Sequence, residues 1–356
     1  MIRAPSRLAL RGVAVVAFVL LPILCATATL AATGTLRGSS FNPGAGTGVA
    51  SGGRHASGPR VATRPRLHLP SPSATASPSL APTEPPLPVP AAAPPLFSSA
   101  WLASHPQPSL VLQDRGAILV DVGTRQLMYE TSPNQKLPTA SLAKMVTVLV
   151  ALQHATWTTE LTVPAAATVL EPDATMMGLT AGEQLSVGEL VAGVFLLSAN
   201  DAAETLARAI LPRSAFIRDM NLLVRSWGLR DTAFSNPTGL DDPGEYSTAY
   251  DLAVVAWHVE TDAPGLLGIT SQKEILLPQT ATHKAYDLQT VIGPVLHDFP
   301  GATGMKTGYT DDAGYCIVAT ATRGGRSLIT VVMSAPQDVG VAEALLSYGF
   351  SAAPGA

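Results

Sequence analysis

Residues 137–152 have the sequence LPTASLAKMVTVLVAL, and this stretch decides how the centre of the chain folds. A proline and a capping hydroxyl mark a helix start, and the apolar run after them predicts a helix buried in a core. Ser141 and Lys144 are three positions apart, so on a helix they share one face and the amine can reach the hydroxyl. Ser141 would lie at the amino end, where the helix dipole favours negative charge. The stretch therefore predicts a serine nucleophile with a lysine beside it.

The scarcity of lysine limits chance matches to this pair. The chain has five lysines, and only Lys144 has a serine three positions before it; the five are Lys136, Lys144, Lys273, Lys284 and Lys306. The serine–lysine pair is therefore a moderately specific signal.

A second motif, Ser198-Ala199-Asn200, is weak as a pattern because Ser40-Phe41-Asn42 and Ser132-Pro133-Asn134 have the same form. Its position distinguishes it from the other two, which lie in loops. An apolar run over residues 190–197 precedes it and a helical pattern over 202–207 follows it. This arrangement predicts a turn between two buried helices.

The third motif, Lys306-Thr307-Gly308, precedes a small turn and a strand-like stretch over residues 314–322, so we expect it to begin a strand. Gly308 would let a substrate backbone approach closely, and a strand edge can pair with an extended peptide. Acyl transfer needs a hydroxyl, a base, a proton relay and donors for the oxyanion. Together the three motifs offer a candidate for each requirement.

With these motifs the chain resembles the D-alanyl-D-alanine carboxypeptidase family of low-molecular-mass penicillin-binding proteins, the S11 serine peptidases. The resemblance covers about residues 108–350, with further family signatures at residues 137–145, 177–179, 198–203, 236–242, 246–253 and 306–310. It implies a carboxypeptidase that removes the terminal D-alanine from peptidoglycan stem peptides and that β-lactam antibiotics inhibit covalently. It also implies a β-lactamase/transpeptidase-like fold.

The resemblance further implies a role for each site residue. The catalytic residues would be Ser141, Lys144, Ser198 and Asn200, and the substrate-binding residues Lys306, Thr307, Gly308 and Tyr309. Ser141 would attack the substrate carbonyl with Lys144 as base, and Ser198 would pass the proton to the leaving nitrogen. Asn200 would hold the substrate amide and orient Lys144. The backbone N–H groups of Ser141 and Tyr309 would form the oxyanion hole.

Two positions depart from the family pattern. Thr238 stands where many members carry a histidine, and residues 334–350 contain no arginine, which many members have there. A substrate with a free carboxylate calls for a cation, so Lys306, Thr307 and Arg326 would have to bind it. Lys306 would also help burial to lower the pKa of Lys144.

Other activities of the same acyl chemistry remain open. A D,D-endopeptidase or an esterase would use the same residues on another substrate. A class A β-lactamase needs a deacylating glutamate in a Glu-x-x-Leu-Asn loop, and this sequence has none. The non-enzyme alternative is an idle wall-binding module.

The amino-terminal third has a different composition from the rest. Three arginines precede an apolar run, so residues 1–32 are predicted to be a signal peptide or signal anchor that directs the chain outside the cytoplasm. Residues 33–107, rich in Gly, Ser, Ala and Pro, predict a disordered tether. The catalytic domain is predicted over residues 108–350, with a tail over 351–356. We therefore expect a secreted or membrane-anchored protein, with any tether amino-terminal.

Charge and metal-binding residue types exclude several classes. The chain has 22 basic and 26 acidic residues, so nothing suggests nucleic-acid binding. Cys316 is alone once Cys25 is assigned to the membrane segment, and the histidines are isolated. We expect neither a metal nor a cofactor.

The fold class predicted from these patterns is α/β of the α+β type. Residues 117–121 and 126–130 predict one hairpin, and residues 314–322 and 327–333 a second, followed by a helix over 339–348. Helical patterns occupy the block between the hairpins. We therefore expect an antiparallel sheet whose terminal strands are adjacent, with helices on both faces.

Overall fold

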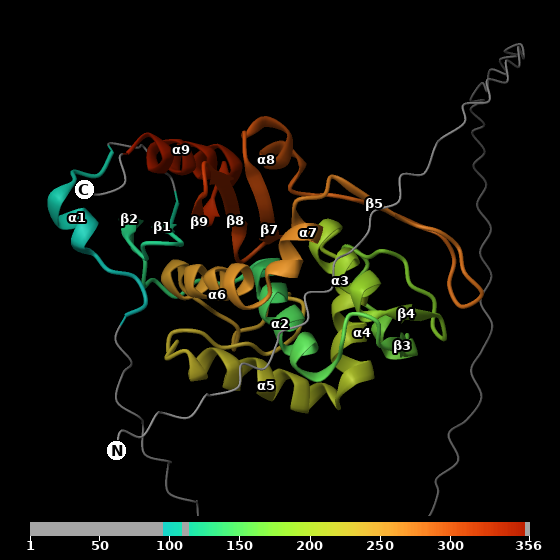
Figure 1. Ribbon diagram of the computed structural model, residues 1–356. Helices are drawn as coiled ribbons and strands as arrows, with labels where there is room; N and C mark the ends of the chain where they lie inside the picture. The colour runs from blue at the N-terminus through green and yellow to red at the C-terminus, as the bar shows by residue number, and fades with distance from the viewer. Residues whose placement is uncertain (1–94, 109–113, 353–356) are drawn as a thin grey trace, which may run out of the picture. The chain divides into compact units, whose positions relative to one another are not determined.

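The computed structural model describes residues 95–108 and 114–352, and its centre is one antiparallel sheet in the strand order β2-β1-β9-β8-β7 (Figure 1). The strands are β1 (Gly116–Asp121), β2 (Leu127–Thr131), β7 (Ala302–Thr310), β8 (Gly314–Arg323) and β9 (Arg326–Ala335). Both predicted hairpins are confirmed. The strands that come first and last along the chain, β1 and β9, pair in the middle of the sheet, where Ile118 is opposite Val331.

The sheet separates two apolar cores because side chains alternate along each strand. Ile118 and Val120 belong to the larger core, whereas Ala117 and Leu119 belong to the smaller one. Helices α8 (Gly293–Asp298) and α9 (Asp338–Ser351) cover the smaller core; α2 (Lys144–His154) and α6 (Ala249–Asp262) lie on the other face (Figure 1). The predicted arrangement of helices on both faces is confirmed.

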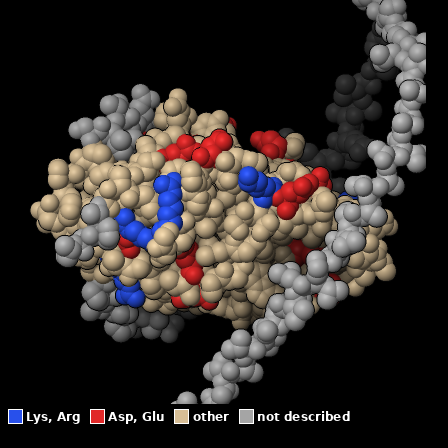
Figure 2. All heavy atoms as spheres, turned by 45° about the horizontal axis from the view of Figure 1, so that its top comes forward, with Lys and Arg blue, Asp and Glu red and all other residues tan. Residues whose placement is uncertain are grey.

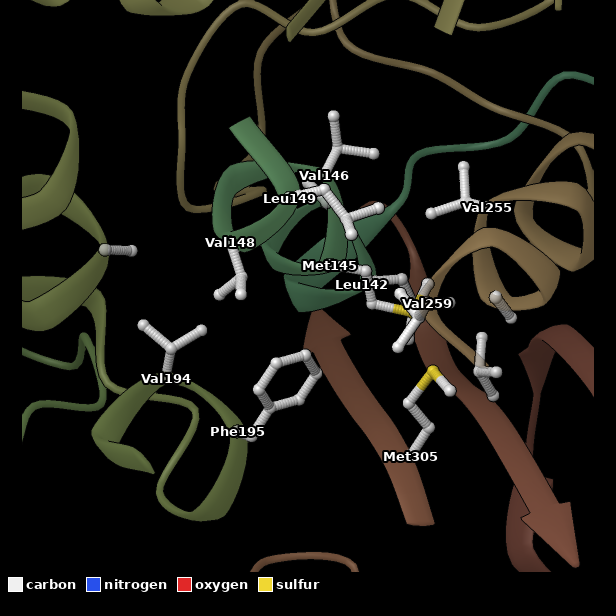
Figure 3. Close-up of a cluster of buried hydrophobic side chains, with 14 of the residues drawn as sticks. Leu142, Met145, Val146, Val148, Leu149, Val194, Phe195, Val255, Val259 and Met305 are labelled. Atoms are coloured by element: carbon white, nitrogen blue, oxygen red, sulfur yellow. The ribbon is translucent and has the colours of Figure 1, made fainter. Parts of the chain in front are cut away.

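Helix α2 is at the centre of the larger core. It packs against α3 (Val187–Leu196), α4 (Asn200–Ile210), α5 (Arg213–Ser226) and α6. Figure 3 shows Val148 directed toward Val194 of α3, with Met145 near Val259 of α6 and Met305 of β7. Burial on several sides explains why its sequence is almost continuously apolar. Helix α2 therefore sits between the helical layer and the sheet.

Most of the smaller elements were not expected from the sequence. Two short hairpins pair β3 (Glu160–Thr162) with β4 (Gln184–Ser186) and β5 (Glu274–Leu277) with β6 (Tyr286–Gln289). Short helices complete the fold: α1 (Ala100–Ser104), η1 (Ala140–Ala143), η2 (Ala165–Ala167), η3 (Pro264–Leu266) and α7 (Leu267–Thr270). The expectation that Lys306-Thr307-Gly308 begins the strand at 314 was wrong. The motif lies inside β7, a separate strand that pairs with β8.

The folded unit begins before residue 108, where the sequence places the end of the tether. Phe97 and Trp101 are buried, and the backbone N–H of Leu127 donates to the carbonyl of Ser98 at 2.9 Å. Two large apolar side chains in the Pro-rich stretch supply this packing. The predicted signal segment and the tether up to residue 94 lie outside the described residues, as does most of the tail.

Charged residues make up 13% of the chain. On the face that Figure 2 shows, basic and acidic side chains form small groups of both signs between neutral residues. None of the helices within residues 95–108 and 114–352 is long and apolar enough to cross a bilayer.

Candidate active site

The predicted nucleophile and base are in contact. Lys144 Nζ lies 2.7 Å from Ser141 Oγ. Ser141 is in the 3₁₀ turn η1 and Lys144 is the first residue of α2, so the helix begins slightly later than the sequence suggested. Lys144 Nζ also donates to the backbone carbonyl of Thr238 at 2.6 Å. The lysine is therefore oriented by a loop carbonyl and by the serine.

The environment of Lys144 favours an uncharged amine. Its side chain is fully buried, and this burial lowers its pKa to about 7, although the carboxyl group of Glu245 acts in the opposite direction. A neutral amine has a lone pair that can accept the proton of Ser141. The expected lowering of the pKa is present and burial is its cause, whereas the expected contribution of Lys306 is not found.

Ser198 and Lys306 form a second hydroxyl–amine pair. Ser198 lies in the turn between α3 and α4, as predicted, with a left-handed φ of 61°. Lys306 Nζ donates to Ser198 Oγ at 2.7 Å and to the carbonyl of Thr307 at 2.6 Å. Burial and the nearby Lys144 lower the pKa of Lys306 well below its usual value. The pair brings together residues 108 positions apart in the sequence.

Asn200 is the first residue of α4, and its side-chain carbonyl oxygen has no hydrogen-bond partner. The residue is only 4% exposed, and Ala199, not Asn200, occupies the helix N-cap. The hydrogen bonds of the Lys144 amine go to Ser141 and Thr238, so the structure does not support the expected contact of Asn200 with that amine. Asn200 is one of the residues that line a cavity, and its buried, unpaired amide oxygen is left able to accept a hydrogen bond.

A cavity of about 550 Å³ joins these residues. Its lining includes six of the predicted site residues: Ser141, Ser198, Asn200, Thr307, Gly308 and Tyr309. A Cβ atom on Gly308 would lie 2.7 Å from the backbone nitrogen of Ser141, so only glycine lets β7 pass this close to η1. Lys144 and Lys306 are buried, so their amines reach the cavity through the two serines.

Arg326 does not belong to this site, contrary to our expectation. Its guanidinium group pairs with Asp121 at 2.6 Å and donates to the carbonyls of Gly349 and Ala352. These partners are in β1 and at the end of α9, and Arg326 does not line the cavity. The arginine therefore ties the carboxyl end of α9 to the sheet.

Three residues near the nucleophile were not identified from the sequence as site residues. Glu245 is buried and accepts hydrogen bonds from Thr139 at 2.9 Å and from Asn236 at 2.7 Å. Asn236 and Thr139 lie in stretches that resemble family signatures, which offered a signal for them. Glu245 lies between two such stretches, and no sequence pattern marks it.

The described residues contain no group of His, Cys, Asp and Glu side chains arranged to hold a metal ion. Burial raises the pKa of the lone Cys316 thiol to about 12, so it is a poor nucleophile and ligand.

Comparison with known proteins identifies the family. The profile of the peptidase S11 family, D-alanyl-D-alanine carboxypeptidase, matches residues 103–337. The D-alanyl-D-alanine carboxypeptidase DacA of Haemophilus influenzae is 35% identical over 66% of this chain and 61% of the relative. DacF of Bacillus subtilis is 31% identical over 64% of this chain and 58% of the relative. The chain thus covers about three fifths of the length of these curated relatives.

Solved structures show the same fold. Penicillin-binding protein 5 of Haemophilus influenzae matches 69% of this chain and 72% of its own, with a TM-score of 0.61 and 33% identity. Penicillin-binding protein D2 of Listeria monocytogenes, solved in a cefotaxime-bound form, matches 68% of this chain and all of its own, with a TM-score of 0.61 and 29% identity. The chain belongs to the D-alanyl-D-alanine carboxypeptidase family, peptidase S11.

Proposed function

We propose that this protein is a serine-type D-alanyl-D-alanine carboxypeptidase that removes the terminal D-alanine from peptidoglycan stem peptides. The observation that carries the proposal is the contact of Ser141 Oγ with the buried amine of Lys144, whose pKa is lowered to about 7. A large fraction of this amine is neutral at physiological pH. The serine therefore has a base in position before substrate arrives.

In the proposed first step, Lys144 takes the proton of Ser141 as the Oγ atom attacks the carbonyl carbon of the penultimate D-alanine. The backbone N–H groups of Ser141 and Tyr309 stabilise the oxyanion. Ser198, held by Lys306, gives its proton to the leaving nitrogen and takes the one held by Lys144, so the C–N bond breaks and free D-alanine departs. Water then attacks the ester on Ser141 and gives a proton to Lys144. That proton passes to Ser141 Oγ as the ester bond breaks, and the shortened stem peptide leaves.

The site has features that suit an extended peptide. Strand β7 ends the sheet on one side, so a substrate backbone can add to its edge. The unpaired amide oxygen of Asn200 would accept a hydrogen bond from a substrate N–H. The hydroxyl of Thr307 would bind the terminal carboxylate, and the Lys306 amine would act on it through Ser198. The same geometry would hold a β-lactam, which acylates Ser141 and so inhibits the enzyme.

Family membership supports a location outside the cytoplasm, because that is where peptidoglycan stem peptides are. In this proposal, residues 1–32 direct export and either are removed or anchor the chain in the membrane. The catalytic part is then connected through the Pro-rich tether.

The test is to incubate the full chain with a peptide ending in D-alanyl-D-alanine and to analyse the products by mass spectrometry. Loss of one alanine residue, with release of free D-alanine, is expected for the natural chain and not for Ser141→Ala. Cleavage at an internal cross-link without release of D-alanine would instead identify an endopeptidase. Penicillin labelling without any hydrolysis would favour an idle binding module.

A further inference from the structure

The two loops that position Ser141 and Lys144 share a buried carboxylate. One loop is residues 137–143, which leads into the nucleophile, and the other is residues 235–240, whose Thr238 carbonyl accepts a hydrogen bond from Lys144. The loops are in close contact, because a Cβ atom on Gly239 would lie 1.7 Å from the carbonyl oxygen of Ala140. Glu245, which is 5% exposed, lies behind both.

Each carboxylate oxygen of Glu245 holds one loop. Oε1 accepts from the hydroxyl of Thr139, two residues before Ser141, at 2.9 Å. Oε2 accepts from Asn236 Nδ2 at 2.7 Å and, at longer distance, from the hydroxyl and backbone N–H of Ser235.

Asn236 links Glu245 to the loop that contacts the base, Lys144. Its Oδ1 accepts hydrogen bonds from the N–H groups of Thr238 and Gly239, at 3.0 and 2.8 Å, and from the Thr238 hydroxyl. Its Nδ2 also donates to the carbonyl of Leu240. These bonds fix the loop whose Thr238 carbonyl binds Lys144 Nζ.

We infer that Glu245 is a positioning residue of the acylation step, which holds the nucleophile and the base in register and sets the charge of Lys144. This inference rests on the proposed function. The carboxylate touches neither substrate nor the reacting atoms; it acts through Thr139, Asn236 and the field on Lys144.

Charge couples the carboxyl group to the base. Burial raises the pKa of Glu245 to about 7, and its negative form raises the pKa of Lys144. Lys144 in turn lowers the pKa of Lys306, the buried amine near it. The serine can be deprotonated only by neutral Lys144, so the pH at which acylation becomes fast depends on the charge of Glu245.

The experiment measures the acylation rate of the full chain by a fluorescent penicillin from pH 5 to pH 9. In Glu245→Gln the negative charge is gone, so the acidic limb of the profile should move to lower pH. The maximal rate should fall about tenfold because the two loops lose their shared anchor. A role in folding alone would lower the rate evenly and leave the limb in place.

Glu260→Gln is the matched control. Burial also raises the pKa of Glu260 to about 7, but Glu260 is not among the charges that act on Lys144. The acidic limb of the pH profile of Glu260→Gln should coincide with that of the natural chain. Coincident limbs for Glu245→Gln and the natural chain would overturn the inference.

Thr139→Val gives a second test that keeps the glutamate. It removes a hydrogen bond that lowers the pKa of Glu245, so the carboxyl is neutral over a wider range and the limb should again move to lower pH. If Glu245→Gln does not fold, an unmoved limb in folded Thr139→Val overturns the inference. A natural chain that penicillin never labels would refute the proposed function itself, and a labelled chain with unmoved limbs would refute only the role of Glu245.

Discussion

Lys306 Nζ donates to Ser198 Oγ at 2.7 Å, and this bond joins strand β7 to the turn between α3 and α4. The lysine side chain is completely buried, and it also donates to the carbonyl of Thr307. Burying an amine with two neutral acceptors reduces the free energy of unfolding. Its cost is offset if the hydroxyl that it orients takes part in the proton transfers of the proposed reaction.

Replacing Lys306 by glutamine should slow acylation by a penicillin about a hundredfold, because Ser198 loses the donor that fixes its lone pair. Ser198→Ala should have a similar effect. Since the two residues act as a unit, the double variant should be little slower than either single variant. The exposed Lys273→Gln serves as the control for loss of a lysine. Additive losses in the double variant would show that the two side chains act independently.

Lys144→Met should abolish acylation and yet stabilise the protein at acidic pH. The folded-state pKa of about 7 lies below the ordinary value of 10.5, so the folded chain resists a proton that the unfolded chain accepts. This difference in pKa lowers the free energy of unfolding by about 5 kcal/mol below pH 7, where the lysine is charged in both states. The destabilisation decreases as the pH rises toward 10.5. Methionine cannot donate to the Thr238 carbonyl, and the loss of this hydrogen bond should reduce the stabilisation by about 1–3 kcal/mol.

The net gain from Lys144→Met should therefore be larger at pH 6 than at pH 9. Thermal or urea unfolding of the variant and the natural chain at both pH values measures it. Equal destabilisation of the variant at the two pH values would mean that the pKa of Lys144 is not lowered in the folded chain.

Arg326→Met should cost about 3 kcal/mol of folding stability and leave the Michaelis constant for a D-alanyl-D-alanine peptide unchanged. The side chain pairs with Asp121, which is 3% exposed, and removing one partner leaves a buried charge unpaired. Arg326→Lys retains the charge without the planar fork and should be intermediate in stability. An increase in the Michaelis constant of the folded variant would show that Arg326 contributes to substrate binding.

The parts of the fold that local patterns encode could be predicted from the sequence. The hairpins at both ends of the domain and helix α2 are marked by clear apolar runs. Strand β7 does not, because residues 302–310 contain two glycines and a buried lysine in place of alternating apolar residues. The strands β3 and β4 have three residues each, too short for a recognisable pattern.

The site divides in the same way. Ser141 and Lys144 are three residues apart, so helical geometry alone predicts their contact. Ser198 and Lys306 are 108 residues apart, and only the family resemblance brought them together. Thr139 and Glu245, separated by 106 residues, depend on the packing of two irregular loops, which no local pattern describes.

Gly239→Ala tests whether the contact between those loops is needed. Gly239 has φ +78°, and an added Cβ would meet the carbonyl oxygen of Ala140, the residue before Ser141. Gly178 has a similar φ of +83° but open space around its missing side chain. Gly178→Ala therefore measures the backbone cost alone, about 1–2 kcal/mol.

Gly239→Ala should lose at least about 2 kcal/mol more than Gly178→Ala, because the backbone of η1 must move to remove the clash. Any folded Gly239→Ala should also be labelled by penicillin at least about a hundredfold more slowly, since a shift of the nucleophile by a fraction of an ångström disturbs its contact with Lys144. Thermal unfolding and labelling kinetics of the two variants provide the comparison. Equal behaviour of the two alanine variants would show that the loop contact can relax without moving Ser141.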